Sequence, residues 1–171
     1  MAEQLVIWLT ERGIGTCYCG MGRPVKNATI TGEYFITLAL GYPSAKEQWR
    51  ESEEQFKRKE MEKLLIGDKE NDFLEPFIRY ARLAPSAVNS QPVVYEMDGN
   101  SIKVFRKPPL FSKLERMGRI DTGIAIAHLY MYAAEHGYHI DIYKDGSTKK
   151  DKLIYFLTLN VLEEVEDEEI H

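Results

Sequence analysis

The sequence has few of the residues on which many metal and covalent enzymes depend. It contains only two cysteines, Cys17 and Cys19, and no other cysteine could complete a four-ligand zinc site. The histidines, none of which has a ligand spacing with these cysteines, are His128, His136, His139 and His171. No Ser-His-Asp arrangement or paired-carboxylate motif is present. We therefore expect no metal site, and we expect both thiols to be free in a reducing compartment.

Long apolar runs are also absent. No stretch approaches the roughly 18 apolar residues of a membrane-spanning helix, and no signal peptide opens the chain. The net charge of −5 argues against nucleic acid as the main partner. We therefore expect a cytoplasmic protein with neither a membrane nor a nucleic acid as partner. At 171 residues, 44% of them hydrophobic, the chain is long enough to bury the core of a globular domain.

Hydrophobic periodicity predicts an α+β fold with a mixed sheet. The predicted helices are Ala2–Arg12, Asn71–Leu83 and Ile120–His136. The predicted strands or extended segments are Ile14–Gly20, Glu33–Gly41, Val93–Met97, Ile102–Phe105, Tyr138–Tyr143 and Leu153–Val161. Residues 51–63 are expected to be partly helical, and the acidic tail, residues 163–171, is expected to be disordered.

Local signals refine these elements. Gly13 and Gly137 stand where a left-handed C-terminal helix cap is favoured. Pro76 places the true start of its helix near Glu75. Asp98-Gly99-Asn100, between two strands, is a strong hairpin signal.

Two segments are apolar enough to predict burial. The strand Glu33–Gly41 has apolar residues on both faces, which indicates a strand buried within a sheet. The helix Ile120–His136 is apolar on most sides, so we expect it to be a central buried helix.

The chain repeats one order of elements. Glu11-Arg12-Gly13-Ile14 matches Glu135-His136-Gly137-Tyr138 at an offset of 124 (135 − 11). Tyr34-Phe35-Ile36-Thr37-Leu38 matches Tyr155-Phe156-Leu157-Thr158-Leu159 at an offset of 121 (155 − 34). The repeat predicts two halves in a pseudo-twofold relation, with the two matching helices side by side. Residues 1–66 would be the remainder of the first half, 67–162 the second half and 163–171 the tail, with the front part of the first half missing.

The stretch Ala84–Pro92, named the cradle, connects a predicted helix to a predicted strand. Pro85 and Pro92 interrupt regular structure at its two ends. The uncharged polar side chains between them are Ser86, Asn89, Ser90 and Gln91. By composition alone, a simple helix-to-strand connection is favoured over a polar ligand site, because Ser and Asn are common in turns.

The cradle, Ala84-Pro85-Ser86-Ala87-Val88-Asn89-Ser90-Gln91-Pro92, resembles the A-P-S-x-x-N-x-Q-P-W segment of the flavin-dependent nitroreductase family. Gly13-Ile14-Gly15-Thr16-Cys17 is similar to the family's G-x-G-T-x-W turn, and Leu40-Gly41-Tyr42-Pro43 to its G-Y-P strand end. The helix opening at Arg119-Ile120-Asp121-Thr122-Gly123 also fits. The resemblance covers about Leu5 to Val161 and is greatest to a subfamily in which two nitroreductase-like halves are fused.

The resemblance implies a flavin mononucleotide (FMN) site and no catalytic side chain, because the flavin carries the chemistry. The residues matching cofactor-binding positions of the family are Pro85, Ser86, Ala87, Asn89, Gln91, Gly15, Thr16, Cys17, Arg58 and Lys59. Hydroxyl and amide groups would bond the flavin, the glycines would let the backbone approach the ring, and Arg58 and Lys59 would reach the phosphate. For Arg58 and Lys59 an ordinary solvated surface is an equal alternative.

The function implied is an NAD(P)H-dependent oxidoreductase that reduces nitro compounds, quinones or similar small acceptors in a ping-pong cycle. The alternative is a non-catalytic, truncated subunit, with or without flavin, that pairs with another chain. The family's N-terminal Arg-Arg-Ser-x-Arg phosphate clamp is absent here, which favours the alternative, and the intact cradle favours the enzyme. Because a first half without its front part would leave some of Leu5, Trp8 and Leu9 uncovered, we expect a homodimer or a missing N-terminal segment supplied in trans.

Overall fold

The computed structural model describes residues 2–29, 31–44, 49–146, 148, 150 and 152–163. The chain forms two compact units, Met1–Gln55 and Phe56–His171. Nearly all of the acidic tail that was expected to be disordered lies outside the described residues. Among the described residues, the longest helices are too short or too polar to cross a membrane.

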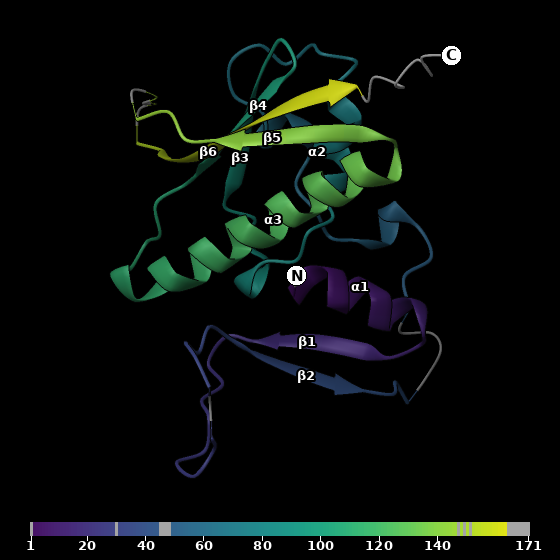
Figure 1. The fold of residues 1–171 in the computed structure, drawn as a ribbon, viewed down its shortest axis with the longest axis vertical. Coiled ribbons are helices and arrows are strands. Elements are labelled where there is room, and N and C mark those ends of the chain that lie inside the picture. Colours follow the sequence, from purple (N-terminus) through teal and green to yellow (C-terminus); the bar gives the residue numbers. More distant parts are fainter. Residues whose placement is uncertain are drawn as a thin grey trace, which may run out of the picture. The chain divides into compact units, whose positions relative to one another are not determined.

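The described residues of the first unit form one α-helix, a two-stranded sheet and a 3-10 turn at Glu53–Gln55. Helix α1 (Ala2–Glu11) ends before Gly13, whose φ of +74° confirms the predicted left-handed cap. Strands β1 (Gly15–Cys19) and β2 (Thr37–Gly41) pair antiparallel (Figure 1). Of the α1 residues expected to be uncovered, Leu5 and Trp8 are about half exposed, and Leu9 is buried.

The predicted strand Glu33–Gly41 is shorter than expected and is not buried. It begins only at Thr37, and the side chain of Leu40 is 56% exposed. The prediction of burial on both faces was therefore wrong. The strand is exposed because, among the described residues, β2 pairs with β1 alone, and a two-stranded sheet buries little apolar surface.

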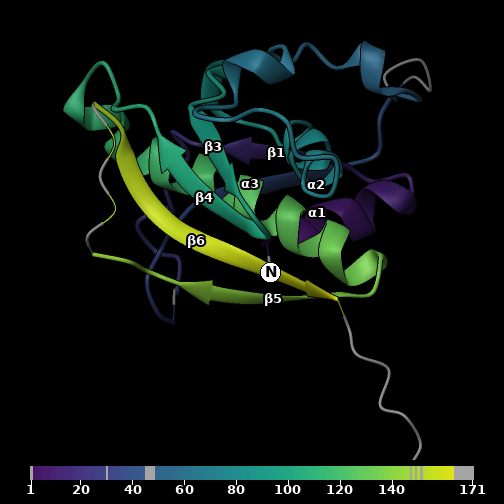
Figure 2. The same cartoon turned by 90° about the horizontal axis from the view of Figure 1, so that it is seen from above.

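The second unit is built on a four-stranded antiparallel sheet. Its strands are β3 (Val93–Asp98), β4 (Ser101–Arg106), β5 (Tyr138–Tyr143) and β6 (Ile154–Glu163). They lie in the order β3-β4-β6-β5 (Figure 2). The pairings among these four strands are all antiparallel, unlike the mixed sheet predicted, and the parallel contact of β3 with Leu65 is an isolated bridge at Tyr95. Gly99, with a φ of +56°, closes the predicted β3–β4 hairpin.

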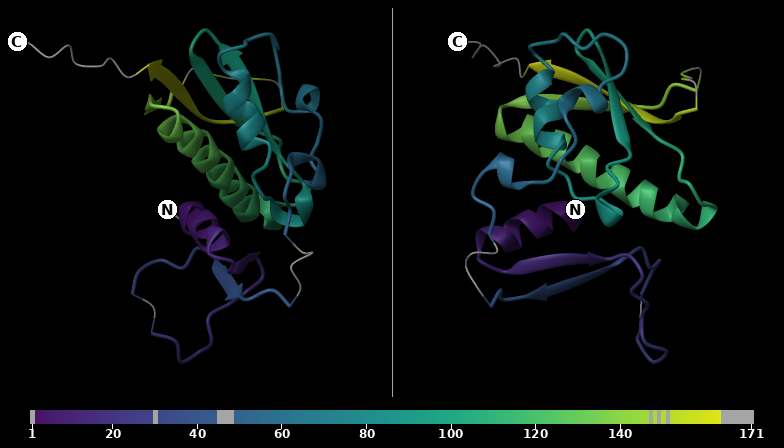
Figure 3. Two further views of the ribbon diagram at one scale, coloured as in Figure 1. Left: turned by 90° about the vertical axis from the view of Figure 1, so that its right-hand side faces the viewer. Right: turned by 180° about the vertical axis from the view of Figure 1, so that it is seen from behind.

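Two helices complete the core of this unit. Helix α2 (Glu75–Ala81) has Pro76 in its first turn, as predicted. Helix α3 (Glu115–Glu135) begins five residues before the predicted Ile120 (120 − 115) and runs alongside the sheet (Figure 3). It is buried along one broad face, but Tyr130 on another side is 48% exposed, so the expected burial on most sides is only partly met.

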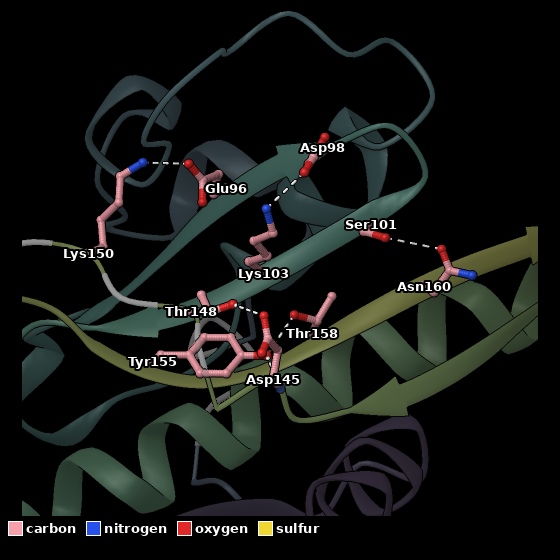
Figure 4. Close-up of polar contacts among 10 residues, drawn as sticks. All are labelled: Glu96, Asp98, Ser101, Lys103, Asp145, Thr148, Lys150, Tyr155, Thr158 and Asn160. Atoms are coloured by element: carbon pink, nitrogen blue, oxygen red, sulfur yellow. Dashed lines mark hydrogen bonds and ion pairs between the residues drawn. The ribbon is translucent and has the colours of Figure 1, made fainter.

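Polar side chains join three strands of the sheet and the β5–β6 connection (Figure 4). Lys103 bonds to Asp98 at 2.8 Å, and Lys150, in the connection, pairs with Glu96 of β3. The hydroxyl groups of Tyr155 and Thr158 lie 2.7 Å apart, and Thr158 is only 1% exposed. In the connection, the Asp145 N–H donates to the Tyr155 hydroxyl at 3.2 Å, so the connection is tied to β3 through Lys150 and to β6 through Asp145.

Candidate functional site

The cradle adopts an unusual backbone conformation. Its middle, Ala87–Asn89, forms a 3-10 turn. Three residues of the cradle have a positive φ although they are not glycines: Val88 (49°), Asn89 (54°) and Gln91 (47°). For a β-branched residue such as Val88 this conformation is a clear outlier, and strain of this kind costs about 1–3 kcal/mol per residue. It persists only where surrounding contacts impose it, so the contacts of the cradle define its shape.

The first set of contacts lies within the cradle and reaches α3. The backbone N–H of Gln91 donates to Ser86 Oγ at 2.9 Å. The backbone N–H of Ala87 donates to Asp121 Oδ1, on α3, also at 2.9 Å. These bonds hold the two ends of the 3-10 turn and fix it on the helix.

The second set of contacts comes from residues 57–59, which lie alongside the cradle. The backbone N–H of Lys59 donates to Gln91 Oε1 at 2.7 Å, and Asn89 Nδ2 donates to the carbonyl of Lys57 at 2.9 Å. Arg58 Nη1 donates to Asn89 Oδ1 at 3.2 Å. The structure thus brings together five of the predicted site residues, Arg58, Lys59, Ser86, Asn89 and Gln91. Their role toward a cofactor stays a prediction.

The Arg58 and Lys59 side chains bond to carbonyl groups of the chain. Arg58 Nη2 donates to the carbonyl of Leu83, just beyond α2, at 2.8 Å. Lys59 Nζ donates to the carbonyl of Gln91 at 2.9 Å. Partial burial, followed by repulsion from Lys107 and Lys63, lowers the pKa of Lys59 from its ordinary value. Mutual repulsion among cations indicates a positive potential beside the cradle.

A small cavity lies beneath the cradle. Its lining includes Pro85, Ser86 and Gln91 of the cradle, and Asp121 and Ala125 of α3. Its volume of about 20 Å³ has room for about one water molecule. Ligand pockets of about 300–1,000 Å³ are more than ten times larger. The cavity is therefore too small for a ligand of the size of FMN.

A group of buried charges behind the cradle was missed by the sequence analysis. Arg106, at the end of β4, is only 1% exposed and bonds to Glu115 Oε1 at 2.6 Å. Its guanidinium packs on Gly118, where an added Cβ would lie 2.7 Å from Nη1. Burial raises the pKa of Asp121, against the opposing effects of the Ala87 N–H and of Arg106. The sequence carried no local signal for this group, because an arginine at a strand end is usually exposed.

Asp121 supports a prediction about the cradle. Asp121→Ala should lower the free energy of unfolding by about 1–3 kcal/mol, because the Ala87 N–H loses its acceptor. Asp121→Asn, which keeps an acceptor oxygen, should cost less. Urea denaturation of both variants would measure the difference. An asparagine variant less stable than the alanine variant would contradict this role.

The raised pKa of Asp121 predicts that the stability of the protein depends on pH. A raised pKa in the folded state means that the fold favours the protonated carboxyl of Asp121. The stability gained from this preference is therefore complete below 3.8, the pKa of the carboxyl in the unfolded chain. It is lost as the pH rises through the folded-state value. The stability of Asp121→Asn relative to the parent should therefore increase from pH 4 to pH 7. A constant difference across this range would contradict the raised pKa.

Pro85 and Ala87 belong to the cradle itself, and the remaining three predicted site residues, Gly15, Thr16 and Cys17, lie on β1 in the first unit. Gly15 pairs with Gly41 of β2, and a Cβ at Gly15 would lie 3.2 Å from the Gly41 carbonyl oxygen. Close strand packing is therefore sufficient reason for glycine at this position. Thr16 is half-buried, and Cys17 and Cys19 are free thiols, Cys17 being exposed. A site shared by Gly15, Thr16, Cys17 and the cradle stays a prediction.

The fold is that of the nitroreductase-like α+β proteins. A crystal structure of a "putative nitroreductase" from Thermotoga maritima matches with a TM-score of 0.64 and 25% identity, over 94% of this chain. The family described as "Putative TM nitroreductase" matches residues 1–133. The chain belongs to this family, which confirms the nitroreductase resemblance seen in the sequence.

The similar solved structures are matched over only part of their length. The chain spans 61% of the Thermotoga maritima chain. A "Putative NADH Oxidase" from Clostridium acetobutylicum is 16% identical over 57% of this chain and 80% of its own, with a TM-score of 0.45. A nitroreductase family protein from Clostridium novyi has the same identity and TM-score over 57% of this chain and 76% of its own. No curated protein matches the chain.

Proposed function

We propose that the chain acts in an FMN-dependent oxidoreductase that transfers electrons from NAD(P)H to nitro compounds, quinones or similar small acceptors. Bound flavin would supply the redox chemistry, accepting a hydride from NAD(P)H and passing electrons on in a ping-pong cycle. The observation that carries the proposal is membership of the nitroreductase family together with a strained polar cradle beside clustered cations.

The chemistry of the cradle fits a flavin with a phosphate. Ser86, Asn89 and Gln91 offer neutral hydroxyl and amide groups, which suit ribityl hydroxyls and the polar rim of the ring. Arg58 and Lys59 meet them within hydrogen-bond distance, and the neighbouring Lys107 and Lys63 add positive charge. Such a group of cations suits a phosphate of nearly two negative charges. The role of the chain is to hold and orient the cofactor and to stabilise its phosphate.

One observation favours the second candidate, a subunit that does not bind flavin. The side chains of Asn89 and Gln91 already bond to residues 57–59, so part of their capacity is used within the chain. A cofactor would have to share or replace these bonds. The two candidates therefore differ in a measurable property, the affinity of the purified chain for FMN.

Titration with FMN tests the proposal through quenching of flavin fluorescence. The parent should bind, and Asn89→Ala should weaken binding by about ten- to a hundredfold, corresponding to roughly 1–3 kcal/mol for unpaired polar groups. Ser90→Ala is the matched control, because the exposed Ser90 side chain lies outside the matched positions. Circular dichroism of each variant would separate loss of binding from loss of folding.

Two results would count against the enzyme. Equal FMN affinity of Asn89→Ala and the parent would remove the cradle from the site. A folded parent that binds no FMN would favour the flavin-free subunit.

A further inference from the structure

The two units contain the same arrangement of helix, glycine and antiparallel strands. α1 is followed by Gly13 (φ +74°) and β1, and α3 is followed by Gly137 (φ +71°) and β5. The register agrees as well. The repeat in the sequence relates β1 to β5 by an offset of 124 residues and β2 to β6 by an offset of 121 residues. With these offsets, Gly15 corresponds to His139 and Gly41 corresponds to Leu162. Gly15 pairs with Gly41, and His139 likewise pairs with Leu162. All five pairs of β1 and β2 become pairs of β5 and β6 in this way.

A side-chain contact repeats with the backbone. Tyr34 precedes β2 and Thr37 is its first residue, and their hydroxyl groups lie 2.8 Å apart. Those of the matching residues, Tyr155 and Thr158, lie 2.7 Å apart in β6. Agreement of register, glycine cap and hydroxyl pair identifies β2 as the counterpart of β6.

The counterparts differ at the strand edge. β6 lies between β5 and β4, whereas β2 pairs with β1 alone within the described part of the chain. Val161 of β6 is completely buried, and its counterpart Leu40 is 56% exposed. Leu159 is also completely buried, and its counterpart Leu38 is only half-buried. Leu38 and Leu40 of β2 are therefore more exposed than Leu159 and Val161 of β6, which lie beside β4.

The backbone of β6 shows which groups of β2 face the open edge. Val161 N–H donates to the carbonyl of Asn100, in the β3–β4 turn, at 2.9 Å. Because N–H groups on a strand alternate between its two edges, Val161 and Leu159 face β4. By the same register, the N–H groups of Leu40 and Leu38 face the outer edge of β2.

We propose that the outer edge of β2 is a docking site for an antiparallel β-hairpin of the same kind as β3–β4. A hairpin is the occupant because β3–β4 is what lies against the matching edge of β6. The similar Thermotoga maritima chain is longer, since this chain spans 61% of it, so a relative carries additional polypeptide that could include one. Strand addition to an open edge supplies backbone hydrogen bonds, and the apolar side chains of Leu38 and Leu40 would select an apolar partner strand. The proposal does not depend on flavin binding.

The probe is a synthetic peptide of residues 92–107, which contains the chain's own β3–β4 hairpin. Without peptide, hydrogen exchange at the Leu38 and Leu40 amides should be fast compared with the Ala39 and Gly41 amides, which face β1. Peptide binding to the full-length chain, measured by calorimetry, should slow exchange at Leu38 and Leu40. Equal protection of all four amides without peptide, or no binding, would overturn the proposal.

A pair of variants at Leu40 tests the edge itself. Leu40→Pro removes the outward N–H and should weaken peptide binding at least about tenfold, because proline is tolerated only on an unpaired edge. Leu40→Val introduces the residue of the matching position in β6 and should keep binding within about twofold. Binding that survives Leu40→Pro would overturn the proposal. Protection of Leu38 and Leu40 that rises with protein concentration and disappears in Leu40→Pro would instead assign the edge to a second copy of the chain.

Discussion

Glu115→Ala is expected to lower the free energy of unfolding by about 2–4 kcal/mol. Arg106 is 1% exposed, and Glu115 Oε1, 2.6 Å away, is its hydrogen-bonded partner. Removing one member of a buried ion pair typically costs about 3–5 kcal/mol, because the remaining charge stays buried without compensation. The lower range applies here because Glu115 is about half exposed and Asp121 remains near Arg106.

Arg106→Met provides the matched control. Methionine keeps much of the volume and removes the cation, and the Glu115 carboxylate left behind is about half exposed, so that it can be solvated by water. In the Arg106→Met background, Glu115→Ala should then cost less than about 0.5 kcal/mol, the usual effect at a surface position. Urea denaturation of the four proteins completes a double-mutant cycle. Equal effects of Glu115→Ala in both backgrounds would show that the ion pair does not carry the stability.

Phe77→Ala is expected to cost about 3–5 kcal/mol, the range for removing a large aromatic side chain from a core. Phe77 is 1% exposed on α2, and its ring centroid lies 4.7 Å from that of Tyr132 on α3 and 5.4 Å from that of Tyr138 on β5. These contacts join α2 to α3. Since α2 leads into the cradle and α3 carries Asp121, the substitution should weaken the proposed binding of FMN as well as stability.

Phe77→Leu is the control for size and packing. It retains most of the apolar volume, and exchanges that conserve volume usually cost less than about 1.5 kcal/mol. Thermal and urea unfolding would compare the two variants. A loss below about 1 kcal/mol for Phe77→Ala would mean that the α2–α3 interface tolerates a cavity at its centre.

Elements with a strong local signal were predictable from the sequence. Gly13, Gly137 and Gly99 each adopt the positive φ that caps or turns require, and Pro76 sits in the first turn of its helix. Such signals are local because they depend on the backbone preferences of one residue. The early start of α3 had no such signal, since its first turn contains Glu115, whose bond to Arg106 depends on the folded sheet.

Burial was harder to predict than secondary structure. The β2 segment is as apolar as a buried strand, yet Leu40 is exposed, because burial depends on the neighbour at the strand edge. Part of the candidate site was predicted from the motif, as Arg58 does lie beside Asn89. The support from Asp121 was not predicted, because Ala87 and Asp121 are 34 residues apart and no periodic pattern links them.

The left-handed conformation of the cradle has a consequence for the order of folding. Val88, Asn89 and Gln91 disfavour that conformation on their own, so the turn gains little from local interactions. Apart from bonds within the cradle, such as that between Ser86 and Gln91, the side-chain hydrogen bonds that impose it join residues 31 to 34 positions apart. Closing such loops costs chain entropy before any of these bonds can form. The cradle should therefore take its native shape late, after α2, α3 and the hairpin have packed, and the polar site should be completed last.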